Sequence, residues 1–142
     1  MIRYVEYKDK EAWYALDHAL PETGFDEKVR NRQGYVYVRD GKIIGILRFA
    51  LFWDSIPFCN MLHIDEEQQG NGYGTQLMDR WEADMRSAGC GMVMTSTQVN
   101  ETAQHFYRKR GYQDAGGFVI DVPGYEQPKE LILIKALPAA ME

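Results

Sequence analysis

A glycine-rich stretch between an apolar run and an amphipathic helix is the feature that most constrains this chain. The stretch runs from Gln69 to Thr75 and has glycine at positions 70, 72 and 74. Glycine has no Cβ, so the backbone there can turn sharply and leave several amide N–H groups pointing outward. The helix that follows adds roughly half a positive charge at its N-terminus. The stretch is therefore suited to hold a pyrophosphate.

Three other interpretations of the glycine stretch compete with anion binding. Clustered glycines between a strand and a helix are often only a tight connection. The dinucleotide fingerprint Gly-x-Gly-x-x-Gly fails, because counting from Gly70 or Gly72 puts Thr75 or Leu77 where the third glycine belongs. The Walker loop fails as well, because no Gly-Lys-Ser/Thr sequence follows the glycines. Neither nucleotide motif accounts for the stretch.

The pattern that remains is Gln-x-x-Gly-x-Gly at Gln69, Gly72 and Gly74, which resembles the acyl-CoA pyrophosphate loop of the GCN5-related N-acetyltransferases, the GNAT superfamily. A second block downstream matches the family's Asn-x-x-Ala-x-x-Phe-Tyr-x-x-x-Gly-Tyr segment, at Asn100, Ala103, Phe106, Tyr107, Gly111 and Tyr112. The resemblance implies an α/β fold with a central mixed, mostly antiparallel sheet of about seven strands and flanking helices. It also implies a single domain over residues 1–142.

The hydrophobic pattern predicts the same succession of elements. Asp40 and Gly41 predict a tight antiparallel hairpin, because Asp-Gly between two apolar runs is a strong turn signal. Asp9 and Asn100 are expected to cap helices. The predicted strands are 3–7, 35–39, 42–52, 58–64, 92–97, 118–122 and 131–136, and the predicted helices are 9–20, 26–32, 74–88 and 100–110. The strand at 92–97 follows a helical crossover and is expected to run parallel to the strand at 58–64.

The composition excludes several classes of protein. A formal net charge of -5 argues against a nucleic-acid partner, and it is compatible both with a cationic amine acceptor and with solubility alone. The longest apolar run, Ile43 to Trp53, is too short to cross a membrane, which takes about 20 residues. Cys59 and Cys90 are isolated and the N-terminus has no apolar signal core, so we expect a cytoplasmic protein. The three histidines, His18, His63 and His105, have no ligand spacing, and no metal is expected.

The resemblance implies acetyl-CoA as cosubstrate and direct attack of a bound amine on its thioester, in a ternary complex. It places the pyrophosphate on the backbone of Gln69, Gly70, Asn71, Gly72, Tyr73, Gly74 and Thr75, with the side chains of Gln69 and Thr75 as further donors. It places the developing oxyanion at the backbone N–H groups of Leu62, His63 and Ile64. Asn100 either reaches the pantetheine arm, as the matching family residue often does, or only caps its helix.

Tyr107 is the candidate proton donor for the departing thiolate, by its match to the family's tyrosine. A phenol with a pKa near 10 is protonated at neutral pH and can release its proton as negative charge develops on sulfur. The competing interpretation is a tyrosine that packs beside Phe106 at the edge of the core. A base must also deprotonate the amine, and no spacing singles out one of Asp54, His63, Asp65 or Glu66.

Two rival functions stay open at this stage. One is a regulatory module of the same fold that binds CoA and has lost catalysis. The other is a nucleotide-binding domain of a different fold. The sequence also leaves open the acceptor, which could be a small-molecule amine or a peptide amine, and whether the chain is a monomer or a homodimer.

Overall fold

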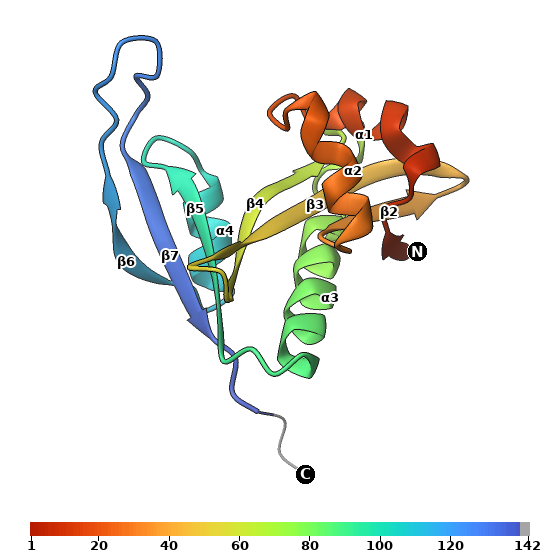
Figure 1. The fold of residues 1–142 in the computed structure, drawn as a ribbon. Coiled ribbons are helices and arrows are strands. Elements are labelled where there is room, and N and C mark those ends of the chain that lie inside the picture. The colour runs from red at the N-terminus through yellow and green to blue at the C-terminus, as the bar shows by residue number, and fades with distance from the viewer. Residues whose placement is uncertain (140–142) are drawn as a thin grey trace. The chain divides into compact units, whose positions relative to one another are not determined.

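The computed structural model describes residues 1–139, and they form two compact units. The first unit consists of residues 1–50 and 59–84, and the second of residues 51–58 and the chain from residue 85 on. Across the described residues, seven strands and four α-helices follow one another in the predicted order (Figure 1). The fold class predicted from the sequence, α/β, is confirmed.

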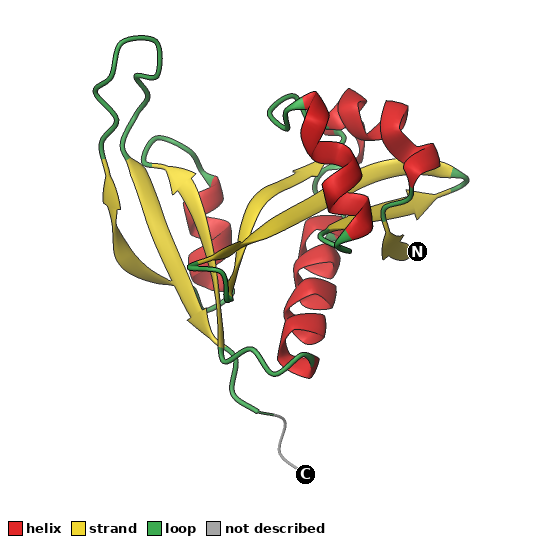
Figure 2. Ribbon diagram, viewed as in Figure 1, coloured by secondary structure: helices red, strands yellow, loops and turns green. Residues whose placement is uncertain are grey.

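The strands are β1 (Ile2–Tyr4), β2 (Gly34–Arg39), β3 (Lys42–Phe52), β4 (Ile56–Ile64), β5 (Met92–Gln98), β6 (Gln113–Phe118) and β7 (Glu130–Ala136). The α-helices are α1 (Lys10–Leu16), α2 (Phe25–Arg30), α3 (Tyr73–Ser87) and α4 (Ala103–Lys109), and three short 3-10 helices are η1 (Tyr7–Asp9), η2 (Glu22–Gly24) and η3 (Glu66–Gln68). Figure 2 shows the helices in red and the strands in yellow.

The first unit contains the strand order β1-β2-β3-β4. β1 pairs with β2 and β2 with β3, both antiparallel. Asp40 and Gly41 join β2 to β3 with φ angles of 52° and 76°. These values suit a two-residue hairpin turn, whose twist matches that of the paired strands. The predicted hairpin is confirmed.

Alternating residues of β2 contact helices on opposite faces of this sheet. Val36 belongs to a buried cluster with Trp13 of α1 and Phe25 of α2. The neighbouring tyrosines instead donate hydrogen bonds to α3. The Tyr35 hydroxyl donates to Asp84 Oδ2 and the Tyr37 hydroxyl to Gln76 Oε1, each over 2.8 Å. Side chains on a strand point alternately to its two sides, so β2 has helices α1 and α2 on one face and α3 on the other (Figure 1).

Apolar residues at helical spacing mark one face of α3, which is buried as far as Trp81 and only half-buried at Met85. Leu77, Met78 and Trp81 are all fully shielded from solvent. Gly45 of β3 allows this close packing, because a Cβ at that position would lie 2.6 Å from Ile64 Cδ1 and 3.3 Å from Leu77 Cδ1. α3 is thereby held close to the sheet, with its N-terminus next to the end of β4.

The second unit contains the strand order β5-β7-β6, and both pairings are antiparallel. β5 and β7 pair along their full length, from Met92 with Ala136 to Gln98 with Glu130. Helix α4 contacts β5. The long connection from β6 to β7 is the green segment at the upper left of Figure 2.

Two predictions for the second unit were wrong. A strand was expected at 118–122, but β6 covers Gln113–Phe118 and no strand follows before β7. All six residues of β6 are exposed, so no alternation of apolar and polar residues marks the strand. Asn100 does not cap the helix, because α4 begins at Ala103 with Thr102 in the capping position.

Asp9 also acts differently from the helix cap that the sequence suggests. It occupies the position before α1 but makes no side-chain capping bond to that helix. Its carboxylate accepts hydrogen bonds from the Glu6 amide at 2.8 Å and from both terminal nitrogens of Arg3 at 2.7 and 2.9 Å. It therefore anchors β1 to the turn η1.

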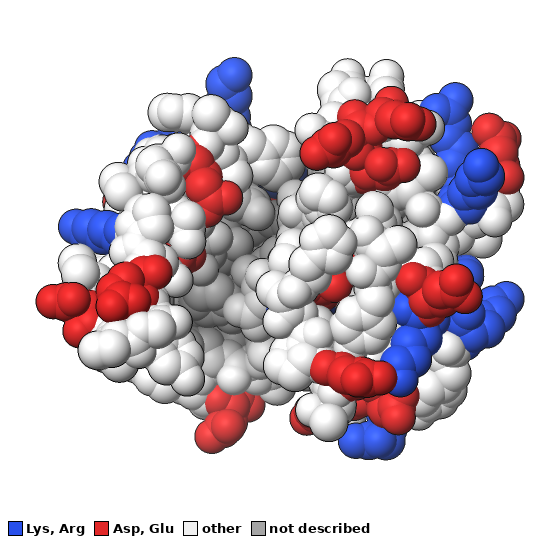
Figure 3. Space-filling view, turned by 90° about the horizontal axis from the view of Figure 1, so that it is seen from above, with Lys and Arg blue, Asp and Glu red and all other residues white. Residues whose placement is uncertain are grey.

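The distribution of charge and the character of the helices bear on possible nucleic-acid and membrane partners. On the face drawn in Figure 3, acidic and basic side chains lie in small interspersed groups. Within residues 1–139, no helix combines the length and the apolar character needed to cross a membrane.

Candidate functional site

The glycine stretch forms an open loop between η3 and α3. Gly70 and Gly72 have φ angles of +83° and +82°, in the left-handed region that other residues rarely adopt. A Cβ built on either glycine meets nothing within 4 Å. The loop therefore borders open space on the side where these two residues lie.

The backbone amides of this loop are available to a ligand. Among the hydrogen bonds of the described residues, the amides of Gly70, Asn71 and Gly72 have no protein acceptor. Residues 73–75 form the first turn of α3, whose amides have no partner within the helix, and the Gln76 amide is bonded to the Gly72 carbonyl at 3.1 Å. Six consecutive N–H groups at the positive end of a 15-residue helix make an anion-binding arrangement.

Two side chains hold the loop in shape. The side-chain nitrogen Nε2 of Gln69 donates a 2.8 Å hydrogen bond to the backbone carbonyl of Ile64, the last residue of β4. The side-chain nitrogen Nδ2 of Asn71 donates a 3.0 Å hydrogen bond to the backbone carbonyl of Gln68. Both side-chain amide groups thus make hydrogen bonds within the protein, and the backbone amides of the loop stay available for an anion.

The start of α3 lies against the end of β4. A Cβ built on Gly74 would lie 3.8 Å from Ile64 Cγ1 and 3.9 Å from Leu62 Cδ2, which is ordinary van der Waals distance. The first unit thus brings together the residues proposed from the sequence for the pyrophosphate and the oxyanion: Leu62, His63 and Ile64 on β4, and Gln69 to Thr75 beside them.

The other two predicted site residues belong to the second unit. Tyr107 of α4 is 6% exposed and packs edge-on against the rings of Phe106 and Tyr112, at centroid distances of 5.3 and 5.5 Å. Asn100 is exposed in the turn that precedes α4. The ring contacts agree with a packing role for Tyr107 and leave its proposed proton transfer a prediction.

The structure adds one residue that the sequence did not indicate. The guanidinium of Arg39, at the end of β2, lies over the ring of Tyr73 at 5.6 Å from its centroid. Its Nη1 also donates to Gln68 Oε1 over 3.4 Å. No motif links Arg39 to a loop 30 positions later, so only the pairing of β2 within the sheet reveals this contact.

The four candidate bases lie in different settings. The Asp65 amide donates to the Ile44 carbonyl at 2.8 Å, which places Asp65 where η3 begins, and Glu66 is exposed in η3. His63 is half-buried on β4. Asp54 is exposed in the turn after β3, with a φ of 62°. Within residues 1–139, no group of three or more His, Cys, Asp or Glu side chains could hold a metal ion.

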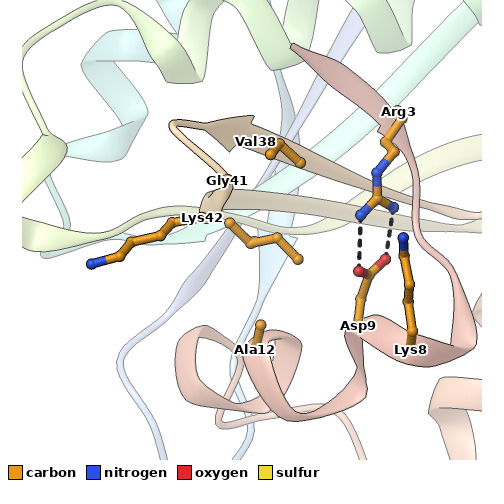
Figure 4. Close-up of a pocket in the computed structure, with 8 residues that line it drawn as sticks. Arg3, Lys8, Asp9, Ala12, Val38, Gly41 and Lys42 are labelled. Carbon is orange, nitrogen blue, oxygen red and sulfur yellow. Dashed lines mark hydrogen bonds and ion pairs between the residues drawn. The ribbon is translucent and has the colours of Figure 1, made fainter.

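A separate hollow of about 520 Å³ lies between α1 and the β2–β3 hairpin (Figure 4). Arg3 faces Asp9 there across two hydrogen bonds, while Lys42 extends away from the pair. The hydrogen bond from Arg3 lowers the pKa of the Asp9 carboxyl, so both groups are charged and neutralise each other at neutral pH. The hollow has no lining residue in common with the glycine loop.

Comparison with known proteins identifies related sequences. The family model described as the acetyltransferase (GNAT) family matches residues 3–112. A Bacillus subtilis (strain 168) protein called "Uncharacterized protein YdhI" is 31% identical over 87 residues, which are 60% of this chain and 52% of that protein. The match thus spans about half the length of this relative.

Solved structures share the fold at low sequence identity. The ribosomal-protein-S18-alanine N-acetyltransferase from Escherichia coli has a TM-score of 0.80 and 18% identity, over 100% of this chain and 96% of that one. N-acetylglutamate synthase from Neisseria gonorrhoeae, solved with coenzyme A and N-acetyl-glutamate, has a TM-score of 0.79 and 15% identity, over 97% of this chain and 35% of that one.

Proposed function

Because this chain belongs to the acetyltransferase (GNAT) family, we propose that it transfers the acetyl group of acetyl-CoA to an amine, by direct attack of the amine on the thioester. The observation that carries the proposal is the run of six available amides over residues 70–75, at the N-terminus of α3. Coenzyme A has a diphosphate, and such an arrangement of N–H groups favours it. The coenzyme A complex of the N. gonorrhoeae enzyme, about a third of whose chain has the same fold, supports this choice of cosubstrate.

The glycine loop suits a phosphate in shape as well as in charge. The space beside Gly70 and Gly72 is open, so phosphate oxygens can approach the backbone there without a Cβ in the way. The bonds from Gln69 to Ile64 and from Asn71 to Gln68 hold the loop before a ligand arrives. A preorganised site loses less conformational entropy on binding.

The chemistry requires three further groups. As the amine nitrogen forms its bond to the acetyl carbon, the carbonyl oxygen gains negative charge, and backbone N–H groups of residues 62–64 on β4 are proposed to stabilise it. The C–S bond then breaks, and the thiolate takes a proton, for which Tyr107 is the proposed donor. The amine gives up its proton to a base, and Asp54, His63, Asp65 and Glu66 stay candidates for that step.

The acceptor is proposed to be a primary amine, either on a small molecule or on a peptide. This follows from the reaction class, since N-acetyltransferases of this fold include one that acts on a ribosomal protein and one that makes N-acetyl-glutamate. The net charge of -5 is compatible with an acceptor that carries positive charge in solution.

Two measurements test the proposed function. Calorimetric titration with acetyl-CoA should show binding with one site per chain, and ATP and NAD should bind far more weakly. Release of free thiol from acetyl-CoA should then rise when a panel of polyamines, amino acids and peptides is added. Binding without thiol release for any acceptor would favour the regulatory module, and no detectable binding at millimolar acetyl-CoA would refute both.

A further inference from the structure

Arg39 projects from the sheet toward the anion-binding loop. It is the last residue of β2 and lies on the same face as Tyr35 and Tyr37, because side chains alternate along a strand. Those two tyrosines both reach α3. Arg39 continues this row to the start of the same helix, where its guanidinium lies over Tyr73, the first residue of α3.

The ring of Tyr73 contacts two side chains of β2. Its ring lies 4.8 Å from the ring of Tyr37, centroid to centroid, and 5.6 Å from the guanidinium carbon of Arg39. The backbone N–H of Tyr73 is one of the available amides of the first helical turn. The contacts of Arg39 with the Tyr73 ring and with Gln68 therefore keep a cation beside residues that flank the glycine loop on either side.

Arg39 is exposed, and its guanidinium has no carboxylate partner among the ion pairs of the described residues. Four other arginines are paired with acidic side chains, Arg3 with Asp9, Arg48 with Asp17, Arg80 with Asp84, and Arg108 with Asp114, whereas Arg30 and Arg32, like Arg39, are exposed and in none of these pairs. Among the hydrogen bonds given for residues 1–139, the Arg39 side chain makes the 3.4 Å bond to Gln68, which is long for an N–H···O bond and costs little to break.

A cation beside the loop would add to its attraction for an anion, because the neighbouring sequence is acidic. Three acidic residues, Asp65, Glu66 and Glu67, lie just upstream of it in the sequence, and no lysine or arginine occurs between Arg48 and Arg80. Amide groups and the helix dipole must attract phosphate against these carboxylates. Arg39 is a cation that the fold brings next to Gln68 and Tyr73, at the two ends of this loop.

We propose that Arg39 is a substrate-binding residue, whose guanidinium donates hydrogen bonds to a phosphate group of the CoA moiety held by the glycine loop. The inference rests on the proposed function, since it assumes that the loop binds acetyl-CoA. Arginine suits this role because its planar fork of donors matches the geometry of phosphate oxygens and never loses its charge at neutral pH. Arg39 acts on substrate affinity and takes no part in proton transfer.

The test compares Arg39→Ala and Arg39→Lys with the wild-type protein in calorimetric titrations with acetyl-CoA. We expect Arg39→Ala to raise the Kd about tenfold, the effect of one lost hydrogen bond to a charged group, and Arg39→Lys to recover part of that loss. Added salt should weaken binding less in Arg39→Ala than in the wild type, because one screened charge pair is gone. Arg30→Ala, which removes an exposed arginine at the end of α2, should leave the Kd unchanged.

Acetyl-dephospho-CoA, which lacks the 3′-phosphate, identifies the phosphate that Arg39 contacts. If Arg39→Ala binds both ligands about tenfold more weakly than the wild type does, the contact is with the diphosphate. If the variant and the wild type bind the dephospho ligand equally well, the contact is with the 3′-phosphate. If the wild type binds acetyl-CoA and Arg39→Ala binds it equally well, the inference is overturned and the proposed function stands. If the wild type binds no acetyl-CoA, the proposed function itself fails.

Discussion

The side-chain amide of Gln69 is bonded to the backbone carbonyl of Ile64 over 2.8 Å. This bond ties the first residue of the glycine loop to the last residue of β4. The resemblance to the family suggests that the Gln69 side chain is a further donor to the pyrophosphate. In the structure this side chain helps to hold the loop in shape, while the amides of residues 70–75 stay available.

Substitution of Gln69 should weaken acetyl-CoA binding in a fixed order. Gln69→Ala removes the bond and is expected to raise the Kd several-fold, since a typical hydrogen bond contributes about 1 kcal/mol. Gln69→Glu is expected to raise it further, because a carboxylate cannot donate to the Ile64 carbonyl and it repels phosphate. Calorimetric titration measures the order. Gln113→Glu, an exposed change on β6, controls for charge alone, and a Gln69→Glu protein that binds like the wild type would contradict the role of the bond.

Two glycines of the loop should respond differently to alanine. Gly72 has a φ of +82°, so Gly72→Ala should lower the free energy of unfolding by about 1–2 kcal/mol in the absence of ligand. Gly74 has no such φ and its added Cβ would make only ordinary contacts, so Gly74→Ala should not lower that stability. Both should bind acetyl-CoA more weakly. Urea unfolding and calorimetry measure the two effects, and a clear loss of stability in Gly74→Ala would show that the packing at Ile64 is tighter than described.

Tyr107→Phe tests the proposed proton donor. The ring would keep its contacts with Phe106 and Tyr112, and only the hydroxyl would be lost. Turnover should fall by about 10² to 10⁴, the usual contribution of one general acid, while the Kd for acetyl-CoA stays similar. Steady-state kinetics with calorimetry measures both, and Tyr7→Phe, an exposed tyrosine in η1, serves as control. Unchanged turnover would assign Tyr107 to packing.

Asp17 is expected to be the most sensitive acidic residue for stability. It is fully buried, accepts hydrogen bonds from Arg48 at 2.7 Å and Trp13 at 3.0 Å, and is also bonded to the amides of Ala19 and Leu20. Asp17→Asn would leave the buried Arg48 without its counter-charge and should cost about 3–5 kcal/mol. Urea unfolding at neutral pH measures this. Asp114→Asn, which breaks the exposed pair with Arg108, should have little effect.

The same carboxyl predicts a pH dependence. Burial by itself would raise the pKa of Asp17, but the hydrogen bonds from Arg48 and the two amides outweigh it and hold the pKa below its usual value. Because the folded-state pKa is lower than the unfolded one, the stabilisation is complete above the unfolded pKa of about 3.9 and is lost as the pH falls through the folded value. Unfolding free energies between pH 7 and 2 should fall more steeply in the wild type than in Asp17→Asn, and parallel curves would exclude this contribution.

Much of the fold was predictable where one face of an element is buried. Leu77, Met78 and Trp81 lie on the face of α3 that the helical spacing indicates, and Asp40 with Gly41 forms the predicted turn. β6 was misplaced for the opposite reason, since it is an exposed strand with glycines at 116 and 117. A Cβ at Gly117 would collide with the Glu130 carbonyl oxygen, so the glycine is required by the pairing with β7 and by nothing in the local sequence.

The sequence by itself determined the chemistry of the glycine loop, because the absence of a Cβ at residues 70, 72 and 74 and the start of a helix are local properties of consecutive residues. Only the tertiary structure decided what surrounds it. The contact of Arg39 with Tyr73 and the bond from Gln69 to Ile64 depend on which segments the sheet and α3 bring together. Such contacts between distant residues follow from the burial of apolar faces over the whole domain, and no short motif encodes them.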